Sequence, residues 1–174
     1  MPDPIEEPLS DDSAAVQIDP GVFRSVLGHF PTGVSVIASV VGEVPVGLAI
    51  GSFFSVSLDP PLVGFCADKG SSSWPGIREA GGFCVNVLHQ DQEALCRQFA
   101  TKGVDKFEGV GWTAASGSGS PQLSDALAWV DCRIEAVHDA GDHEICIGRV
   151  LGLDVGREGG PLVFYRGGYG RFEA

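Results

Sequence analysis

The chain consists largely of short apolar runs separated by glycine, proline and small polar residues. Most runs are rich in valine, isoleucine and aromatic residues, which favour strands, and they are too short for long helices. Gly42-Glu43 and Asp59-Pro60-Pro61 are typical of bends between neighbouring strands. The pattern predicts strands over residues 32–41, 46–50, 53–58, 62–67, 83–88, 128–137, 144–153 and 162–165.

Residues 128–137 alternate most clearly between apolar and polar side chains. Apolar residues occupy the even positions from 130 to 136, and charged residues occupy the odd positions from 131 to 135. This period of two predicts a half-buried antiparallel strand, with Asp131, Arg133 and Glu135 on its polar face.

Three short segments have helical patterns. Asp19 followed by Pro20 is a typical helix start, because the carboxylate caps backbone N–H groups and proline suits the first turn. Apolar residues at 23, 26, 27 and 30 then share one side, and Pro31 ends the helix. Further helices are predicted over 77–80 and 90–100, and residues 112–121 are predicted to form a loop.

The sequence thus predicts about eight short strands and two or three small helices. The number and length of these elements favour an all-β fold over a doubly wound parallel sheet. We therefore expect an antiparallel barrel with a few short helices.

The net charge of −12 over 174 residues is concentrated at the start of the chain. Residues 1–15 contain five acidic residues, three prolines and no lysine or arginine. This segment is predicted to be a disordered acidic tail, followed by a single domain over 16–174. The net charge of −7 on that domain argues against broad binding to nucleic acid or anionic membranes, which requires a basic face.

The five cysteines, at 66, 84, 96, 132 and 146, are an odd number without a C-x-x-C pair. Four lie in strand-like apolar runs, where a free thiol behaves as a small apolar side chain. This usage predicts reduced thiols in a cytoplasmic protein. The sequence shows no secretion signal, and proline, histidine and glycine interrupt the uncharged stretch 25–42, so no membrane span is expected.

Several familiar catalytic patterns are absent from the sequence. It contains no G-x-G-x-x-G, no P-loop and no G-x-S-x-G. His138 and His143 are five residues apart across a predicted turn, which is not zinc-ligand spacing, and no metal site is expected. With few candidate acids, bases or nucleophiles, we expect the protein to position a cofactor that carries its own reactivity.

Residues 45–62 are the most informative segment. Gly47 and Gly51 allow another group to approach the backbone closely, and serines at 52, 55 and 57 supply hydroxyls. This combination suggests a strand edge that holds a flat, polar-rimmed ring. A glycine-bearing core strand would show a similar pattern.

Three further segments could position a cofactor. Residues 69–73, including Lys69, form a cationic, serine-rich loop before a helix, which could hold phosphate or be a plain solvent loop. Gly141-Asp142-His143 is a turn ending in a histidine that is either functional or an exposed surface residue. Residues 164–169 combine aromatic faces with Arg166, and they could stack a ring and hold phosphate or simply end a strand.

The remaining aromatic and charged segments have structural interpretations. His29 is expected at a helix C-terminus, where its charge suits the helix dipole. Residues 105–107 and the loop at Trp112 are expected to be structural or to lie at the rim of a site.

Six segments then occur in a characteristic order: Phe30-Pro-Thr-Gly-Val-Ser-Val-Ile, residues 45–63, Gly82-Phe-Cys-Val-Asn-Val-Leu, Asp105-Lys-Phe, Gly141-Asp-His and Pro161-Leu-Val-Phe-Tyr-Arg-Gly-Gly-Tyr. This order resembles the short-chain flavin reductases, the reductase partners of two-component flavin-dependent monooxygenases. The resemblance runs from about Asp19 to Tyr169. It implies a homodimer with an FMN-binding, Greek-key split β-barrel fold. It also implies binding of FAD or FMN, its reduction by NADH or NADPH, and release of reduced flavin to a partner monooxygenase.

The resemblance also assigns site residues by position. Around the isoalloxazine ring it places Pro45, Val46, Gly47, Leu48, Ala49, Gly51 and Ser52. At the ribityl and phosphate end it places Cys66, Ala67, Asp68, Ser72 and Ser73, with Gln98 and Phe99 as a wall. Facing the nicotinamide nucleotide it places His143, Phe164, Tyr165, Arg166 and Gly167.

Gly51 departs from the family pattern, because many relatives carry Asn or Gln at this position. Hydrogen bonds to the ring edge would then come from backbone or water, and backbone N–H groups at 47–52 would stabilise charge on the reduced ring. Hydride transfer needs no general base, and we expect His143 to orient the nicotinamide. Arg166 is the only obvious nearby cation for the extra phosphate of NADPH, so NADH is favoured. The choice between FAD and FMN stays open.

Two other functions remain alternatives at this point. A flavin store or electron carrier on the same barrel would hold flavin tightly and turn over little. A non-enzymatic partner subunit, docked through its acidic tail, would have no flavin affinity.

Overall fold

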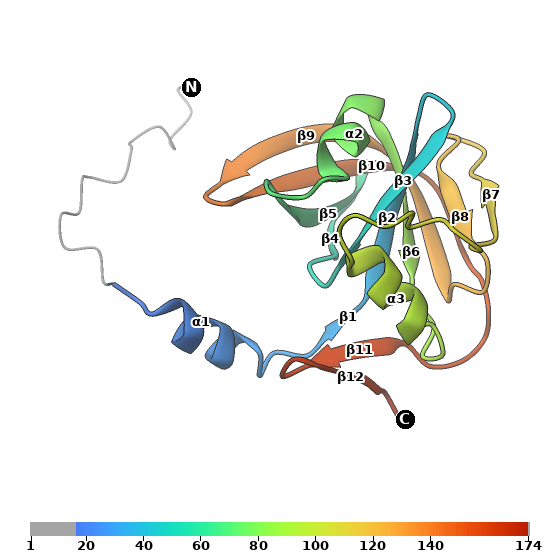
Figure 1. Ribbon diagram of the computed structural model, residues 1–174. Coiled ribbons are helices and arrows are strands. Elements are labelled where there is room, and N and C mark those ends of the chain that lie inside the picture. Colours follow the sequence, from blue (N-terminus) through green and yellow to red (C-terminus); the bar gives the residue numbers. More distant parts are fainter. Residues whose placement is uncertain (1–16, 174) are drawn as a thin grey trace, which may run out of the picture.

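The computed structural model describes residues 17–173 (Figure 1). Residues 1–15, for which we predicted a disordered tail, lie outside the described residues. The helices are α1 (Pro20–Leu27), α2 (Trp74–Ala80) and α3 (Glu93–Ala100). The strands are β1 (Thr32–Gly33), β2 (Ser35–Val41), β3 (Val44–Ile50), β4 (Phe54–Leu58), β5 (Pro61–Asp68), β6 (Gly82–Val87), β7 (Trp112–Ala114), β8 (Pro121–Leu123), β9 (Ala128–Ala140), β10 (His143–Val155), β11 (Leu162–Tyr165) and β12 (Gly168–Arg171).

Seven strands form one antiparallel sheet in the order β3-β2-β6-β9-β10-β5-β4. The long strands β9 and β10 form a hairpin that curves over the molecule (Figure 1). Strands β1, β11 and β12 form a small second sheet, and β7 pairs with β8. The prediction of an all-β, antiparallel fold with a few short helices is confirmed.

The large sheet curls until its two ends are close. Strand β3 lies at one edge and contacts β5, next to the other edge. The Ser52 hydroxyl accepts a hydrogen bond from the Cys66 N–H at 3.0 Å and donates one to the Cys66 carbonyl at 3.1 Å. These bonds hold the connection from β3 to β4 against β5.

Strand β2 separates two apolar cores, because its residues from Ser35 to Ser39 are buried on both faces. Ile37 packs into the core inside the curled sheet, whereas Val36 and Ala38 pack into a second core. Helix α3 covers this second core with Cys96 and Phe99. Strands β2 and β3 are thus held between two packed layers.

The five cysteines are unpaired, and four of them are buried. Burial raises the pKa of the thiols of Cys84, Cys96, Cys132 and Cys146. A thiol held in its neutral form is a poor nucleophile and a poor metal ligand. These four residues act as small apolar side chains. The prediction for strand-like runs holds for Cys84, Cys132 and Cys146, whereas Cys66 is only partly buried and Cys96 lies in α3.

Helix α1 begins where predicted but ends earlier. Asp19 Oδ1 accepts hydrogen bonds from the N–H groups of Gly21 and Val22 at 2.8 and 3.0 Å. The helix ends at Leu27, and Gly28 caps it with an N–H bond to the Arg24 carbonyl at 2.9 Å. No residue of α1 is buried, and Phe30, which we expected on its apolar stripe, is 75% exposed beyond its end. The rest of the described chain therefore does not cover this stripe.

The predicted loop over 112–121 was partly wrong. Its ends form the short strands β7 and β8, because the Asn86 side chain satisfies the backbone of β8. Asn86 Oδ1 accepts from Leu123 N at 2.7 Å, and Nδ2 donates to the Pro121 carbonyl at 3.0 Å. Strand β12 was also not predicted, since glycine interrupts it.

Asp131 is a further correction. We expected it on the polar face of its strand, but it is 1% exposed. Its carboxylate accepts hydrogen bonds from the N–H groups of Gly117 and Ser118, at 2.9 and 3.1 Å, and from the Ser118 hydroxyl. The loop between β7 and β8 thus folds over β9 and supplies the donors that allow a carboxylate to be buried.

No helix among residues 17–173 is long and apolar enough to cross a membrane.

Candidate functional site

Two adjoining clefts follow the outer edge of β3. The lysine cleft, of about 190 Å³, is lined by Leu48, Ala49, Asp68, Ser71, Ser72, Phe99, Ala100, Lys102 and Lys106. The aromatic cleft, of about 170 Å³, is lined by Val34, Ala49, Ile50, Gly51, Cys96, Ala100, Phe164 and Tyr169. Both clefts contain Ala49 and Ala100, so together they form one continuous candidate site between β3 and α3.

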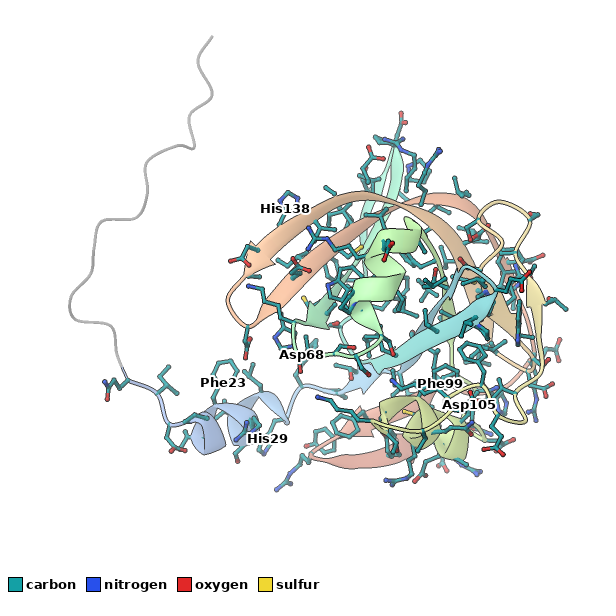
Figure 2. The ribbon with its side chains drawn as sticks, turned by 45° about the horizontal axis from the view of Figure 1, so that its top comes forward. Phe23, His29, Asp68, Phe99, Asp105 and His138 are labelled. Atoms are coloured by element: carbon teal, nitrogen blue, oxygen red, sulfur yellow. The ribbon has the colours of Figure 1, made fainter. Side chains whose placement is uncertain are left out.

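The structure gathers several predicted residues in these clefts. Leu48, Ala49, Asp68, Ser72 and Phe99 line the lysine cleft. Gly51 and Phe164 line the aromatic cleft. In Figure 2, Asp68 and Phe99 lie near the middle of the molecule, whereas Phe23 and His29 lie on and just after the projecting α1. Residues from four separate parts of the sequence thus meet at one site.

Strand β3 offers backbone groups to this site because it is an edge strand. In an antiparallel pair, the N–H and C=O of one residue point to the same side. The Gly47 carbonyl accepts a hydrogen bond from Lys106 Nζ at 3.1 Å, so it points away from β2. The N–H and C=O of Ala49, two residues along, therefore also point outward, at the junction of the two clefts.

The two glycines that we singled out are needed by neighbouring side chains of this chain. A Cβ atom at Gly47 would lie 2.6 Å from the ring of Phe99, and one at Gly51 would lie 2.8 Å from the hydroxyl of Thr32. The space that these glycines leave open is therefore filled by side chains of this protein.

Several residues that we predicted to contact the flavin line neither cleft. Pro45 pairs with Val40 in the β2–β3 ladder, and Val46 packs against the inner core. Ala67 is fully buried in that core. Ser52 lies in the connection from β3 to β4, where its hydroxyl bonds to the Cys66 backbone.

Gln98 fixes the backbone of the segment that carries Lys106. Its side-chain amide donates to the carbonyls of Lys106 and Glu108, both at 3.0 Å. These bonds fix the segment that follows α3, which carries Lys106 into the cleft. Gln98 therefore positions a cleft residue, whereas we had expected it to form a wall with Phe99.

Lys102 was not singled out from the sequence, and Lys106 was expected only in a segment that is structural or at the rim of a site, but both line the lysine cleft. Lys106 Nζ donates to the Gly47 carbonyl and, at 3.2 Å, to the Ser73 hydroxyl, and Lys102 Nζ donates to the Gly70 carbonyl at 3.2 Å. Burial, and then the charge of Lys102, lower the pKa of Lys106. The available signal was that two of the three lysines in the chain lie four residues apart in a non-helical segment.

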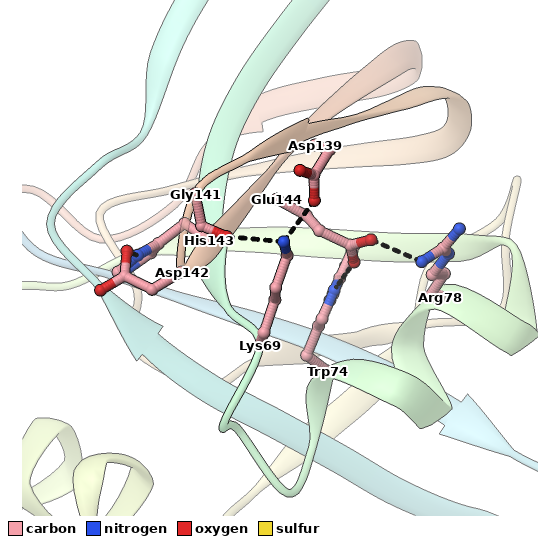
Figure 3. A network of polar contacts seen from close by, with 8 residues as sticks. All are labelled: Lys69, Trp74, Arg78, Asp139, Gly141, Asp142, His143 and Glu144. Atoms are coloured by element: carbon pink, nitrogen blue, oxygen red, sulfur yellow. Dashed lines mark hydrogen bonds and ion pairs between the residues drawn. The ribbon is translucent and has the colours of Figure 1, made fainter. Parts of the chain in front are cut away.

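Lys69, for which we considered phosphate binding, instead bonds to the tip of the β9–β10 hairpin (Figure 3). Its ammonium forms an ion pair with Asp139 and donates to the Gly141 carbonyl at 2.6 Å. Beside it, Glu144 accepts from Trp74 Nε1 at 2.5 Å and from Arg78 at 2.6 Å. These contacts fix the tip of the β9–β10 hairpin to α2 and its preceding loop.

His143 begins β10, directly after a turn at Gly141 with φ of 71°, as predicted. Its Nδ1 donates to Asp142 Oδ1 at 2.7 Å, and this hydrogen bond lowers the pKa of Asp142. The histidine lines a separate hollow of about 650 Å³ that also contains Cys66 and, from α1, Phe23. Its imidazole is 44% exposed and accessible to a ligand.

Residues 164–167 form the hairpin between β11 and β12. Arg166 and Gly167 both have positive φ, 49° and 80°, and the Arg166 N–H donates to the Gly28 carbonyl at 2.9 Å. Phe164 and Tyr169 pack edge to face with centroids 5.3 Å apart. Tyr165 packs edge-on against His29, and Gly167 lines a third, largely apolar hollow beside α1.

His143 lines one hollow, and Phe164 and Gly167 line another. Both hollows also contain Phe23 and Arg24, so α1 lies between the two groups. The predicted nicotinamide residues are therefore divided into two sets on either side of this helix.

The cleft chemistry fits a phosphorylated aromatic ligand. Leu48, Ala49 and Phe99 supply apolar surface, the edge of β3 supplies backbone donors, and Lys102 and Lys106 supply positive charge. No group of three or more His, Cys, Asp or Glu residues in the described part of the chain is arranged to hold a metal ion.

Comparison with known proteins gives a consistent result. A family model described as "Flavin reductase like domain" matches residues 27–173. The chain is 51% identical over 156 residues to the reductase subunit HsaB of a flavin-dependent monooxygenase from Rhodococcus jostii, covering 90% of this chain and 80% of the relative.

Two solved structures are similar in fold and sequence. Nitrilotriacetate monooxygenase component B from Mycobacterium thermoresistibile aligns with a TM-score of 0.85 and 46% identity, covering 88% of this chain and 86% of that chain. The NADH:FAD oxidoreductase SgcE6 from Streptomyces globisporus, solved with NAD and FAD fragments, aligns with a TM-score of 0.83 and 36% identity, covering 91% and 98%.

Proposed function

Because this chain belongs to the flavin reductase like domain family, whose members reduce flavin with NAD(P)H, we propose that the two clefts along β3 bind the flavin. The chain is an oxidoreductase that uses a diffusible flavin and a nicotinamide cofactor. The observation that carries the proposal is the continuous site at Ala49. There, outward backbone groups of an edge strand adjoin an apolar wall and two lysines.

The roles of the residues follow from this placement. Leu48, Ala49 and Phe99 would contact the flat ring, and the outward N–H of Ala49 would donate to its polar edge. This backbone donor takes the place of the side-chain amide that Gly51 lacks. Ser72 and the lysines would contact the ribityl and phosphate end, and Gln98 would hold their segment in place.

When both cofactors are bound, the nicotinamide supplies a hydride and the flavin accepts it, so no protein group has to form a bond. The protein contributes by holding the reactants in a reactive arrangement and by placing donors where negative charge develops. His143, with its Nδ1 bonded to Asp142, would present the other ring nitrogen to the nicotinamide nucleotide. The open clefts allow a reduced product to leave.

We also propose that the active form is a homodimer. The apolar side chains of α1, Val22, Phe23, Val26 and Leu27, are each more than half exposed. An eight-residue helix with an uncovered apolar face gains little stability alone, and a second copy would cover that face. Since α1 lies between His143 and residues 164–167, such an interface would complete the nicotinamide side of the site.

The partner that receives reduced flavin is proposed to be a monooxygenase. The Rhodococcus jostii relative is the reductase subunit of such an enzyme. We place the protein in the cytoplasm, because its unpaired cysteines suit a reducing compartment. We expect NADH to be preferred over NADPH, whereas FAD and FMN are both candidates.

A turnover assay tests the activity directly. Purified protein at catalytic concentration is mixed with an excess of FAD or FMN and with NADH or NADPH, and the loss of the reduced nicotinamide is followed. We expect many turnovers per protein chain with NADH and at least one flavin. If only one nicotinamide is oxidised per protein chain, the protein is a flavin store. If no nicotinamide is oxidised with any of the four pairs of flavin and nicotinamide cofactor, the proposal is refuted.

A further inference from the structure

The turn that carries His143 is held by one residue of a neighbouring loop. The hairpin of β9 and β10 reverses at Gly141 and Asp142, and His143 is the first residue of β10. Lys69 donates to the carbonyls of both turn residues, from Nζ to Gly141 at 2.6 Å and from its backbone N–H to Asp142 at 3.1 Å. Its ammonium also pairs with Asp139, near the end of β9 (Figure 3). Lys69 therefore fixes this hairpin at its tip.

These bonds continue the contact of β5 with β10 beyond their last paired residues. Asp68 ends β5 and lies opposite His143, and Lys69 is the next residue of the chain. On the β5 side, the turn beyond this pair thus depends on the bonds that Lys69 makes. The ion pair with Asp139 is exposed and screened by water, so the two carbonyl bonds are the more important part of the contact.

Both neighbours of His143 in the sequence are held, whereas one side of its ring is free. The Asp142 carbonyl is bonded to Lys69, and Asp142 Oδ1 accepts from His143 Nδ1 at 2.7 Å. Glu144 accepts from the side chains of two α2 residues. Within residues 17–173, His143 Nε2 makes no hydrogen bond, and the imidazole lines the hollow of about 650 Å³. The direction of this ring is therefore set by the turn before it.

The bond to Asp142 also decides what Nε2 can do. In a neutral imidazole, donation from Nδ1 keeps the proton on that nitrogen and leaves Nε2 as an acceptor. The carboxamide of a nicotinamide carries N–H donors that match such an acceptor. Because the Asp142 carboxylate belongs to the turn, a shift of the turn would move Nε2 as well.

The side chain of Lys69 is separate from the proposed flavin contacts. Asp68, Ser71 and Ser72 line the lysine cleft, but Lys69 lines neither cleft along β3. The segment after β5 thus has cleft residues on one side and the lysine that holds the hairpin on the other. A side-chain change at residue 69 is expected to act on the nicotinamide side and to leave the flavin contacts in place.

We propose that Lys69 is a positioning residue for the nicotinamide cofactor, because it holds the turn in the position from which His143 presents its free ring nitrogen. This inference rests on the proposed role of His143. Lys69 contacts neither cofactor, and its effect reaches the nicotinamide nucleotide through the imidazole.

The test is a double-mutant cycle of Lys69→Met and His143→Ala in the full chain. The KM for NADH is measured by steady-state turnover. The Kd for NAD⁺ is measured by calorimetry on protein saturated with FMN, because these two oxidised cofactors do not react with each other. We expect Lys69→Met alone to raise both constants about threefold, and to raise neither further once residue 143 is alanine. The kcat should change by less than about twofold, and the KM for FMN should be unchanged.

Three further variants separate positioning from a general loss of structure. Lys69→Arg keeps the positive charge and N–H donors and should hold the KM for NADH within about twofold of the unmodified value. Arg149→Met is the matched control, because it breaks another ion pair between β9 and β10, away from the tip, and should leave this KM unchanged. Asp139→Asn weakens the contact of Lys69 from the other side and should raise the KM for NADH, by less than Lys69→Met. If Lys69→Met does not fold, the cycle is made with Asp139→Asn.

Three results would overturn the inference. An unchanged KM for NADH in Lys69→Met would show that the turn does not need the lysine. Additive effects of Lys69→Met and His143→Ala would show that Lys69 acts independently of the imidazole. A lower KM for NADH in Asp139→Asn would show that the freed lysine binds the cofactor directly. In each case the unmodified protein still turns over, so the proposed function stands. If the unmodified protein neither oxidises NADH nor binds NAD⁺, both proposals are refuted.

Discussion

Gly47 shows how one missing side chain shapes the site. The ring of Phe99 packs over β3 at this point, and α3 could not approach the strand so closely if residue 47 carried a Cβ atom. Phe99 in turn packs edge to face against Phe107, with centroids 5.0 Å apart, next to Lys106. The wall of the lysine cleft therefore depends on a glycine inside a strand.

We expect Gly47→Ala to destabilise the fold by about 1–3 kcal/mol through overpacking against Phe99. Urea unfolding measures the change in the free energy of unfolding. Gly170→Ala is the control, because a Cβ atom there meets nothing within 4 Å. Equal effects of the two substitutions would show that the contact with Phe99 is not what requires glycine at 47.

His143→Ala tests the nicotinamide side of the site. We expect KM for NADH to rise about three- to tenfold, the effect of losing one hydrogen bond, with flavin affinity unchanged. His138→Ala is the matched control, since His138 is exposed on the neighbouring strand β9 of the same hairpin (Figure 2). An unchanged KM for NADH in His143→Ala would contradict the assignment.

Single residues were predictable from sequence where their role is local. The cap at Asp19, the helix-terminal His29 and the turn before His143 each depend on a few adjacent residues, and the structure has all three as expected. The contacts of Lys106 and the burial of Asp131 were not predicted, because their partners are remote in sequence. Lys106 contacts Gly47 and Ser73. Asp131 contacts a segment whose sequence predicts only a loop, with no sign of the buried carboxylate that it covers.

Among the elements, the loop between β7 and β8 depends most on one buried group. The Asp131 carboxylate receives its three donors from Gly117 and Ser118, and the resulting contact holds this loop against β9. Because β9 pairs with both β6 and β10, the loop is anchored to the middle of the large sheet.

We expect Asp131→Ala to destabilise the protein by about 2–4 kcal/mol, because it leaves backbone donors unsatisfied. Urea unfolding is again the measurement. Glu135→Ala on the same strand breaks only an exposed ion pair with Arg149, which water screens, so it should destabilise the protein much less. A smaller loss for Asp131→Ala than for Glu135→Ala would contradict this account.

Every strand of the large sheet followed from the sequence, whereas β7, β8 and β12 did not. Alternation and apolar runs identified every strand of the seven-stranded sheet, because each is long enough to show a period. Strands β7, β8 and β12 contain three or four residues, and the pairing that defines them comes from remote partners. The early end of α1 was missed because Phe30 continued an apolar pattern beyond Gly28.

At the scale of the whole molecule, the uncovered face of α1 is the most consequential feature. The helix projects from the body of the protein, as Figure 1 shows, and its apolar residues remain exposed. Sequence reasoning predicted the stripe itself, but a pattern along one chain does not show whether the covering surface belongs to the same chain or to another copy.

We expect the unmodified protein to sediment as a dimer and Phe23→Asp to shift it towards monomer, because a charge would be placed on the apolar face. Analytical ultracentrifugation measures the shift. Thr113→Asp introduces the same charge on the exposed strand β7 and should leave the dimer intact. A monomeric unmodified protein would refute the homodimer proposal.

The position of the lysine cleft has a thermodynamic consequence. The cleft takes residues from β3, at one edge of the curled sheet, and from the end of β5, next to the other edge. A ligand bound there would hold the two edges of the large sheet together. Occupancy and resistance to heat would then rise together, and the melting temperature of the protein would report how much flavin it holds.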